Sequence, residues 1–372
     1  MTYHTIIAGL GAVGSATLYQ FAKRGISVLG IDRFKPPHEF GSSHGDTRIT
    51  RQAIGEGPEY TPLSLRSYEI WEDIEKEIGT KVLHKCGGLI LSGESNVAAM
   101  HGSRFFDNTV DAANVFNIPH EILSAPEIRS RFPQFRVADS DKAYYEPSAG
   151  FLIPERCISA NLRLAAKAGA ELRFHDPIMD INFKGDLIEV VTQSAVYSCE
   201  HLVLATGAWL PGMTQVPDFA NLKVYRQVMT WFAPKSSGEM YRPERCPVYI
   251  WERAHKALPL YGFPMVDEYG VKICTEFFEE TCRPETVERN VHPDAYEWLY
   301  EELVEGYFNG IHPECTRVKA CLYTVEPEFK FKIERHPECN RIILASTCSG
   351  HGFKHSAALG EQLCQMVLRD EF

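Results

Sequence analysis

The chain begins with two short apolar runs separated by a stretch of helical periodicity. Residues 6–8 (Ile-Ile-Ala) form the first run, and residues 28–31 (Val-Leu-Gly-Ile) form the second. The apolar residues between them are spaced as on one face of a helix, and they are Val13, Ala16, Leu18, Phe21 and Ala22. The pattern therefore predicts a strand, a helix and a second strand over residues 5–32.

Several later segments carry helix signals. Thr61 fits the N-cap of a helix whose apolar stripe ends at Gly79. Ser124 and Glu127 form a capping-box signature for a short helix that ends near residue 133. Periodicity predicts three more helices, over residues 154–168, about 295–308 and 357–367.

Short apolar runs between these helices predict strands. Residues 82–85 and 89–92 flank Gly87-Gly88 and are expected to form a hairpin, as are residues 178–183 and 187–192 about Gly185-Asp186. Residues 202–209 form a buried strand that ends at a glycine turn, which either borders a cofactor or serves only the core. Further strands are expected at residues 172–174, 224–232, 247–251, 258–263, 271–277 and 341–346.

The turn after the first strand carries a glycine fingerprint. Gly9 permits a tight turn, Gly11 lets backbone N–H groups approach a pyrophosphate, and Gly14 lets the helix pack closely on the strand. Asp32 ends the second strand at the spacing where a carboxylate binds an adenosine ribose. The alternative is a set of ordinary turn glycines, but the strands, helix and acid in register favour FAD or NAD over NADP.

Composition narrows the choice of partners and compartment. A net charge of −11 over 372 residues argues against nucleic acid or an anionic membrane as a partner, because both need clustered cations. No apolar run reaches membrane-spanning length, and the first strand starts almost at Met1, so we expect no signal peptide and a cytoplasmic protein. The 11 cysteines lack metal-site spacing, which predicts reduced thiols and no metal.

Two glycine-rich loops are dense in polar groups. The loop over residues 36–51 carries His44, Thr47, Arg48 and Arg51 and is expected to contact a ligand, the alternative being a solvated loop with salt-bridging arginines. Residues 349–354 (Ser-Gly-His-Gly-Phe-Lys) precede the last helix, so their backbone N–H groups and the helix dipole favour an anion. A helix entry that binds nothing is the alternative there.

As a set, these motifs resemble the monomeric sarcosine oxidase family, which includes the N-methyltryptophan oxidases, among amine-oxidising flavoproteins related to D-amino acid oxidase. The matching stretches are residues 9–14 with Asp32, 41–51, 55–57, 225–227, 261–264, 272–273, 321–323 and 349–354. They extend along the whole chain, and the loops at 41–51 and 349–354 are the most specific to this group. The cofactor implied is therefore FAD.

The resemblance also implies roles around the flavin. Cys321 is expected to bond through sulfur to the 8α carbon of FAD, and Gly350, Gly352 and Lys354 are expected to border the cofactor. Lys272 is expected to lie where oxygen reacts, since a fixed cation in a dry site stabilises developing superoxide. Arg48 is a second expected cation beside the ring, and His44 and Thr47 are expected cofactor contacts.

A substrate site follows from the same resemblance. Arg51 and Lys354 are expected to clamp a substrate carboxylate, while Tyr261 and Tyr323 wall the amine. The reaction expected is oxidation of a secondary amino acid to an imine, whose hydrolysis gives an aldehyde and a primary amine, with O2 reduced to hydrogen peroxide. We expect a monomeric enzyme.

One position departs from the family pattern. Four residues after Lys272, where these enzymes usually carry a histidine near the substrate amine, the chain has Glu276. A carboxylate there favours the unreactive protonated amine unless burial keeps the acid neutral, or it recognises a cation on a larger substrate. Ser43 and Cys348 are smaller departures.

The fold expected is α+β, with a Rossmann-like FAD-binding domain and a mixed-sheet substrate domain interleaved along the chain. The first comprises residues 1–82, 142–216 and 318–372, and the second comprises residues 83–141 and 217–317. Three alternatives stay open. The first is an oxidase of another amino acid, either a cyclic one such as pipecolate or proline or a cationic one. The second is an amine dehydrogenase that uses another electron acceptor, and the third is a flavin-bearing binding protein.

Overall fold

The computed structural model describes residues 2–93, 104–183, 185–253 and 258–369. Its first sheet has the strand order β10-β11-β12-β1-β2-β9, and β19 pairs with β12 and with β18. The central strands β1, β2, β12 and β19 run parallel. The strands are β1 (Thr2–Ala8), β2 (Val28–Ile31), β9 (Glu171–Arg173), β10 (Ile178–Asn182), β11 (Ile188–Thr192), β12 (Val196–Leu204), β18 (Lys332–His336) and β19 (Cys339–Ser346).

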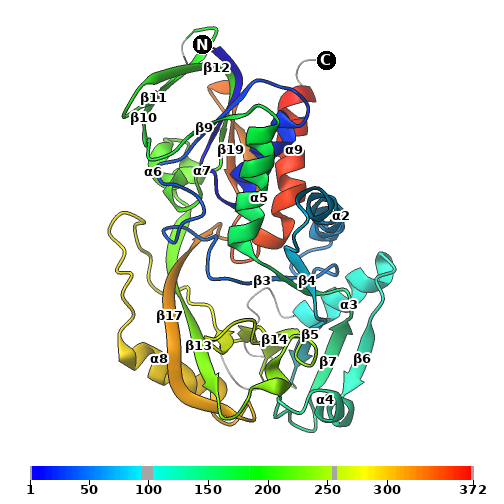
Figure 1. Cartoon of the computed structure of the whole chain (residues 1–372). Helices are drawn as coiled ribbons and strands as arrows, with labels where there is room; N and C mark the ends of the chain where they lie inside the picture. Colours follow the sequence, from blue (N-terminus) through cyan, green and yellow to red (C-terminus); the bar gives the residue numbers. More distant parts are fainter. Residues whose placement is uncertain (1, 94–103, 184, 254–257, 370–372) are drawn as a thin grey trace.

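Helices cover one face of this sheet (Figure 1). Helix α1 (Ala12–Ala22) packs against both α5 (Pro154–Lys167) and α9 (Ser356–Leu368), and α9 also packs against α2 (Tyr60–Ile78). Their apolar faces share one core with strand residues such as Ile7, Val203 and Ile343. Burial of this apolar face, more than helix propensity, fixes the helices on the sheet.

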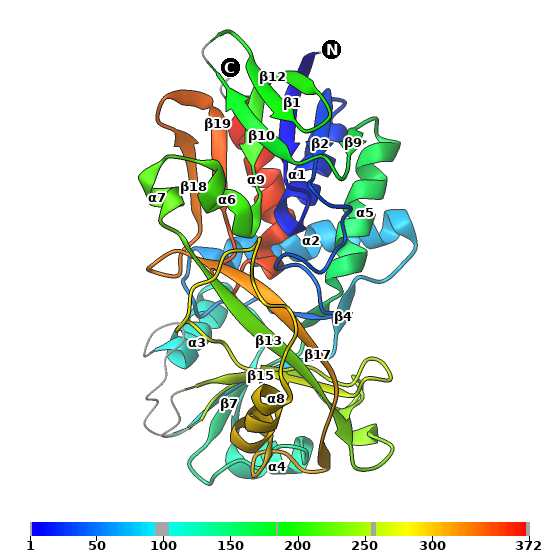
Figure 2. The same ribbon diagram turned by 90° about the vertical axis from the view of Figure 1, so that its left-hand side faces the viewer.

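A second, mixed sheet of eight strands forms the lower half of Figure 1, in the order β17-β13-β16-β15-β14-β5-β7-β6. Figure 2 shows its two long strands, β13 and β17, crossing the middle of the molecule. The strands are β5 (Gly88–Ser92), β6 (Glu121–Ser124), β7 (Lys142–Glu146), β13 (Lys223–Pro234), β14 (Val248–Glu252), β15 (Leu260–Gly262), β16 (Val271–Cys274) and β17 (Ile311–Val325).

The remaining elements are short. Three strands, β3 (Arg48–Thr50), β4 (Leu83–Lys85) and β8 (Gly150–Leu152), form a separate small sheet in the order β3-β8-β4. The other helices are α3 (Phe105–Val115), α4 (Ala125–Arg131), α6 (Leu210–Met213), α7 (Pro217–Ala220), α8 (Pro293–Leu299), η1 (Gly207–Trp209), η2 (Glu239–Tyr241), η3 (Tyr300–Val304) and η4 (Phe353–His355). No helix within the described ranges is both long and apolar enough to span a membrane.

Most locally encoded elements are confirmed. The strand–helix–strand unit at residues 2–31 is present, and β10 pairs with β11 as the expected hairpin. The capping box is complete, because Ser124 and Glu127 each bond the other's backbone. The helix predicted to stop at Gly79 does so, with that glycine in the left-handed region at φ +69°. The α+β fold class is confirmed.

Other expectations were wrong. Residues 82–85 and 89–92 form no hairpin, because β4 pairs with β8 while β5 pairs with β7 and β14. Each strand finds a partner distant in sequence, which local turn signals do not encode. Helix α2 starts at Tyr60, with Glu59 and not Thr61 at the N-cap. The loop at 36–51 contains β3, and the helix expected to reach residue 308 ends at Val304.

The division into two domains stays a prediction. Two of its expected boundaries meet the second sheet, since residue 318 falls within β17 and residue 142 begins β7. Strand β17 pairs with β13 from Ile311 to Val325, so this segment belongs to the second sheet along its whole length.

Candidate active site

One large cavity, of about 420 Å³, lies among the described residues where the two sheets meet. It is lined by the glycine turn after β1 and by Asp32 from the first sheet. It is also lined by Tyr261 of β15 and Tyr323 of β17 from the second sheet. The cavity therefore joins the nucleotide fingerprint to the aromatic residues expected around the substrate.

Backbone contacts fix the fingerprint beside this cavity. A Cβ atom on Gly14 would lie 1.8 Å from the carbonyl oxygen of Gly9, so only glycine permits this approach of helix to turn. The Asp32 carboxylate accepts hydrogen bonds from the backbone N–H groups of Leu10 (2.7 Å) and Phe34 (2.8 Å). Burial raises the pKa of Asp32, although these two donors oppose the rise.

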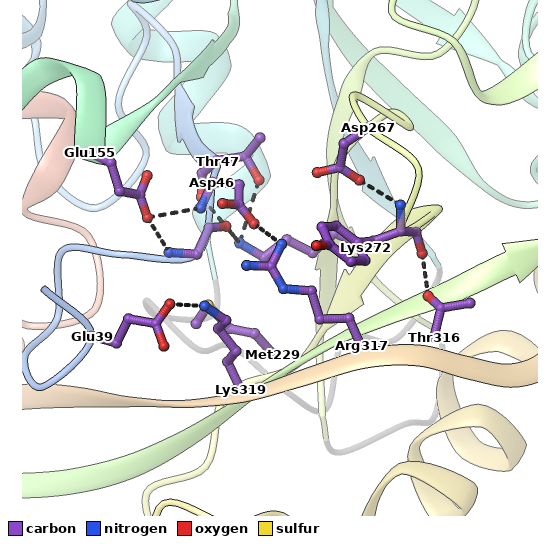
Figure 3. Close-up of polar contacts among 12 residues, drawn as sticks. Glu39, Asp46, Thr47, Glu155, Met229, Asp267, Lys272, Thr316, Arg317 and Lys319 are labelled. Carbon is purple, nitrogen blue, oxygen red and sulfur yellow. Dashed lines mark hydrogen bonds and ion pairs between the residues drawn. The ribbon is translucent and has the colours of Figure 1, made fainter. Parts of the chain in front are cut away.

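The loop over residues 39–48 is held from both sides (Figure 3). Glu155 of α5 accepts hydrogen bonds from the backbone N–H groups of Gly45 (2.7 Å) and Asp46 (3.2 Å). On the other side, Arg317 and Lys319 of β17 form ion pairs with Asp46 and with Glu39 respectively. The polar loop is thus anchored to both halves of the molecule, while its contact with a ligand stays a prediction.

Lys272 projects from β16 toward this loop (Figure 3). Its ammonium group donates to the carbonyl oxygens of Gly45 (2.8 Å) and Thr47 (3.2 Å) and lies over the rings of Trp231 and Phe263. Burial, reinforced by the charge of Arg48, lowers the pKa of Lys272 to about 8. The site thus holds a dry cation whose charge depends on pH near neutrality.

Arg48 joins the cavity wall to the thiol of Cys321. One guanidinium nitrogen donates to the carbonyl of Ser42 (2.8 Å) and lies 3.5 Å from the sulfur of Cys321. The thiol is buried in β17, and this burial raises its pKa. The cation of Arg48 opposes that rise and favours the thiolate.

Arg51 and Lys354 hold a carboxylate that belongs to the chain itself. The ammonium group of Lys354 lies 3.1 Å from one oxygen of Glu56, and Arg51 forms an ion pair with the other oxygen. All three side chains are buried, and Lys354 also donates to the carbonyl of His351 (2.8 Å). Burial lowers the pKa of Lys354 to about 8, although Glu56 opposes the fall.

Glu276 follows β16 and lies in the cavity wall near the two tyrosines. Burial raises its pKa to about 8, and a hydrogen bond with Tyr323 limits the rise. One carboxyl oxygen of Glu276 is buried and has no hydrogen-bond partner within the described part of the chain. The environment thus keeps this acid largely neutral at pH 7, the condition under which it tolerates an amine beside it.

Comparison with known proteins identifies the family. The FAD dependent oxidoreductase family matches residues 4–366. The chain belongs to this family. Monomeric sarcosine oxidase of Streptomyces avermitilis is 36% identical over 99% of this chain and 94% of its own length. N-methyl-L-tryptophan oxidase of Yersinia pestis is 31% identical over 97% of this chain and 94% of its own length.

A solved structure shows the same fold. NikD, described as an unusual amino acid oxidase essential for nikkomycin biosynthesis, superposes with a TM-score of 0.82 at 20% identity, covering 99% of this chain and 94% of its own. The two proteins therefore share a fold, and the family match is what identifies this chain as an FAD-dependent oxidoreductase.

The cavity fits the FAD that this oxidoreductase family uses. A Cβ atom on Gly11 would meet only the hydroxyl of Ser43 at 3.8 Å, so the turn leaves space where a pyrophosphate would lie. His44 is buried with both ring nitrogens unpartnered among the described residues, and burial lowers its pKa to about 3. Thr206 likewise has a buried hydroxyl without a described partner at the cavity. The hydroxyl of Thr206 is therefore the group at the cavity that suits a bound ligand better than a closed protein core.

The predicted site residues fall into two groups. Those lining the cavity are Gly9, Gly11, Asp32, Arg48, Arg51, Tyr261, Glu276, Tyr323, Gly350, Gly352 and Lys354. Gly14, His44, Thr47, Lys272 and Cys321 do not line it; the last four are buried behind its wall. The structure brings all of them to one region, while their individual roles stay predictions.

Sequence reasoning missed three residues of this oxidoreductase site. Glu56 lies in the matched stretch 55–57 and only five residues after Arg51, so its charge was a usable signal. Thr206 lies within residues 202–209, for which a border with a cofactor was one of the two interpretations left open. Glu155 lies in the first turn of α5, and no local pattern indicates its contact with the distant Gly45.

Away from the cavity, three residues of the described chain bring possible metal-ligand atoms within 4.8 Å of one another. They are His4, Glu200 and His201.

Replacing Glu56 with glutamine tests the buried ion cluster. Glu56→Gln leaves Arg51 and Lys354 without their shared counter-charge, so the free energy of unfolding should fall by about 3 kcal/mol at pH 7, measured by urea denaturation. The loss should be smaller at pH 9, because Lys354, with its lowered pKa, sheds its proton. Glu361→Gln, which breaks a more exposed pair with Arg66, should cost under about 1 kcal/mol. Equal losses in the two variants would contradict the account.

Proposed function

We propose that this protein is a flavin-dependent oxidase of N-methyl and related secondary amino acids. The observation that carries the proposal is the buried pair of Arg51 and Lys354 at a cavity that also reaches the nucleotide turn. The pair already holds one carboxylate, that of Glu56. Relatives named monomeric sarcosine oxidase and N-methyl-L-tryptophan oxidase, whose named substrates are N-methyl amino acids, support the same class.

Substrate binding begins with exchange of carboxylates. The α-carboxylate of the amino acid takes the place of Glu56 between Arg51 and Lys354. Two buried cations favour an anion at that point and, through the planar guanidinium, orient it. Because Tyr261 and Tyr323 also line the cavity, the amine end then lies against aromatic walls from which water is excluded.

FAD supplies the chemistry of amine oxidation by accepting hydride equivalents from the carbon next to nitrogen. The chain supplies the geometry, since Gly9, Gly11 and Asp32 would hold the dinucleotide and Arg48 would contribute a cation beside its ring. The imine formed from the substrate hydrolyses to an aldehyde and a primary amine.

Lys272 distinguishes an oxidase from a dehydrogenase. Reduction of O2 by one electron creates a negative charge, which a cation in a dry site stabilises strongly. The ammonium group of Lys272 is buried, lies near Arg48 and is held by two carbonyl groups of the anchored loop. We propose that this fixed cation acts where O2 would meet the reduced cofactor, which would make hydrogen peroxide the product.

A covalent link between Cys321 and FAD is part of the proposal. Support comes from the position of the thiol behind the cavity wall and from the guanidinium of Arg48 at 3.5 Å, which favours the thiolate. Attachment through the 8α carbon would prevent loss of the cofactor.

The substrate class is tested by mixing enzyme and amines without oxygen and following flavin absorbance. Sarcosine, N-methyltryptophan, pipecolate, proline and a cationic N-methyl amino acid form the panel, with dimethylamine as the match for sarcosine that lacks the carboxylate. Secondary amino acids should bleach the flavin and dimethylamine should not. Arg51→Met should weaken amino acid binding by about a hundredfold or more, because it removes a desolvated charge partner. Arg66→Met, a change at the exposed pair, is the control. No bleaching by any amino acid would favour a binding protein.

Lys272→Met tests the oxygen step separately. Reaction of the reduced variant with O2 should slow by orders of magnitude, while anaerobic reduction by the amine survives, measured in two stopped-flow experiments. Lys235→Met, at an exposed lysine, should change neither rate. A parallel fall in both rates would remove Lys272 from the oxygen step. If the unaltered enzyme reacted at normal rates with artificial electron acceptors but did not react with O2, it would be a dehydrogenase.

Acid precipitation tests the covalent link. Yellow colour should remain with the precipitated protein and should move to the supernatant in Cys321→Ser, whereas Cys364→Ser, at a buried cysteine of α9, should retain it. Colour in the supernatant of the unaltered protein would refute the link.

A further inference from the structure

Glu276 is the one carboxyl group, among the described residues that line the cavity near the tyrosines, with an oxygen left unpartnered. It follows β16, and both of its carboxyl oxygens lie 3.5 Å from the point that a Cβ atom on Gly350 would occupy. Its exposed fraction is only 5%. A buried polar atom that faces a cavity without a partner indicates a ligand atom that completes the hydrogen bond.

Charged and titratable groups from four elements face Glu276. Tyr323 of β17 forms a hydrogen bond with it, and Tyr261 of β15 lies near enough for their charges to interact. Lys354 of η4 attracts its charged form, whereas Glu56, in the loop before α2, repels it. Burial is the largest influence and raises the pKa of Glu276 to about 8, so the resting group is mostly neutral at pH 7.

The nitrogen of the substrate poses a proton problem that this group can solve. Alkyl amines have pKa values near that of lysine, about 10, so a secondary amino acid arrives as an ammonium ion. The ammonium form has no lone pair and cannot be oxidised. Two cations, Arg51 and Lys354, are already buried at the cavity, so a third positive charge there needs a local anion.

We propose that Glu276 contacts the substrate nitrogen and accepts one proton from its ammonium form, so that the amino acid reacts as the neutral amine. This inference rests on the proposed function and adds a catalytic residue to it. In the transfer the N–H bond breaks, its electron pair stays on nitrogen as the lone pair, and an O–H bond forms on the carboxyl group. The proton that the resting Glu276 carries leaves to solvent as the ammonium ion binds.

A matched pair of inert ligands isolates this proton. Dimethylsulfonioacetate is a carboxylate with a permanent positive charge where the substrate has its nitrogen, and (methylthio)acetate is its neutral counterpart. Both present the same carboxylate to Arg51 and Lys354. Any proton that Lys354 gains, and any effect of displacing Glu56, therefore cancels in the difference between the two ligands.

The experiment is isothermal titration calorimetry of the holoenzyme at pH 7 in two buffers of different ionisation enthalpy, which counts protons exchanged on binding. The sulfonium ligand should release about one proton more than the thioether, because it ionises Glu276. The ratio of the enzyme's affinity for the sulfonium ligand to its affinity for the thioether should rise about tenfold from pH 6 to pH 7 and level off above pH 8.

Two variants complete the test. Glu276→Gln should abolish the proton difference and lower the preference for the sulfonium ligand by about tenfold or more, while thioether binding changes little. Glu252→Gln is the control, since Glu252 is another buried carboxyl group with its pKa raised to about 7, but it does not line the cavity. That variant should keep the full difference.

The outcomes separate this inference from the function on which it rests. Binding of both ligands to the unaltered enzyme without a proton difference overturns the role of Glu276 alone, as does a difference that survives in Glu276→Gln. Failure of both ligands to bind overturns the carboxylate site itself and with it the proposed function. The comparison in the unaltered enzyme decides the matter even if the glutamine variant does not fold.

Discussion

The structure depends on the burial of cations around one cavity. Arg51, Lys272 and Lys354 are each at least 94% buried, and Glu56 is the carboxylate that pairs with two of them. Removing such charges from water is costly unless anions or carbonyl oxygens compensate. The fold supplies that compensation through Glu56 for one pair and through the anchored loop for Lys272. Buried cations of this kind favour anionic ligands at the cavity.

Three short elements from distant parts of the chain bring these cations together. Arg51 follows β3, Lys272 lies on β16 and Lys354 precedes α9. The sequence predicted the elements that local signals encode, such as the strand–helix–strand unit and the capping box at Ser124. It misplaced residues 82–92, because β4 and β5 pair with strands that local turn chemistry cannot specify. Periodicity indicates which face of a helix or strand is buried, but it does not indicate which other element that face packs against.

The sequence likewise predicted some features of the site and not others. Glycine spacing and the resemblance to sarcosine oxidases pointed to residues that the structure places in the cavity wall, such as Gly9, Arg51 and Tyr323. The state of Glu276 could not be predicted, because its raised pKa comes from burial among side chains of β15, β17 and η4. The pairing of Glu56 with Lys354 could not be predicted either, since it spans nearly 300 residues of sequence, although its proximity to Arg51 was a usable signal. Tertiary burial decides both the charge and the partners of an ionisable group.

Displacement of Glu56 by a ligand carboxylate would be seen directly in a crystal structure of the holoenzyme with (methylthio)acetate bound. We expect the carboxylate of the ligand to lie between Arg51 and Lys354, with the side chain of Glu56 moved away. The sulfur should lie toward Glu276 and Tyr323. A ligand bound elsewhere while Glu56 keeps both of its cationic partners would contradict the central claim.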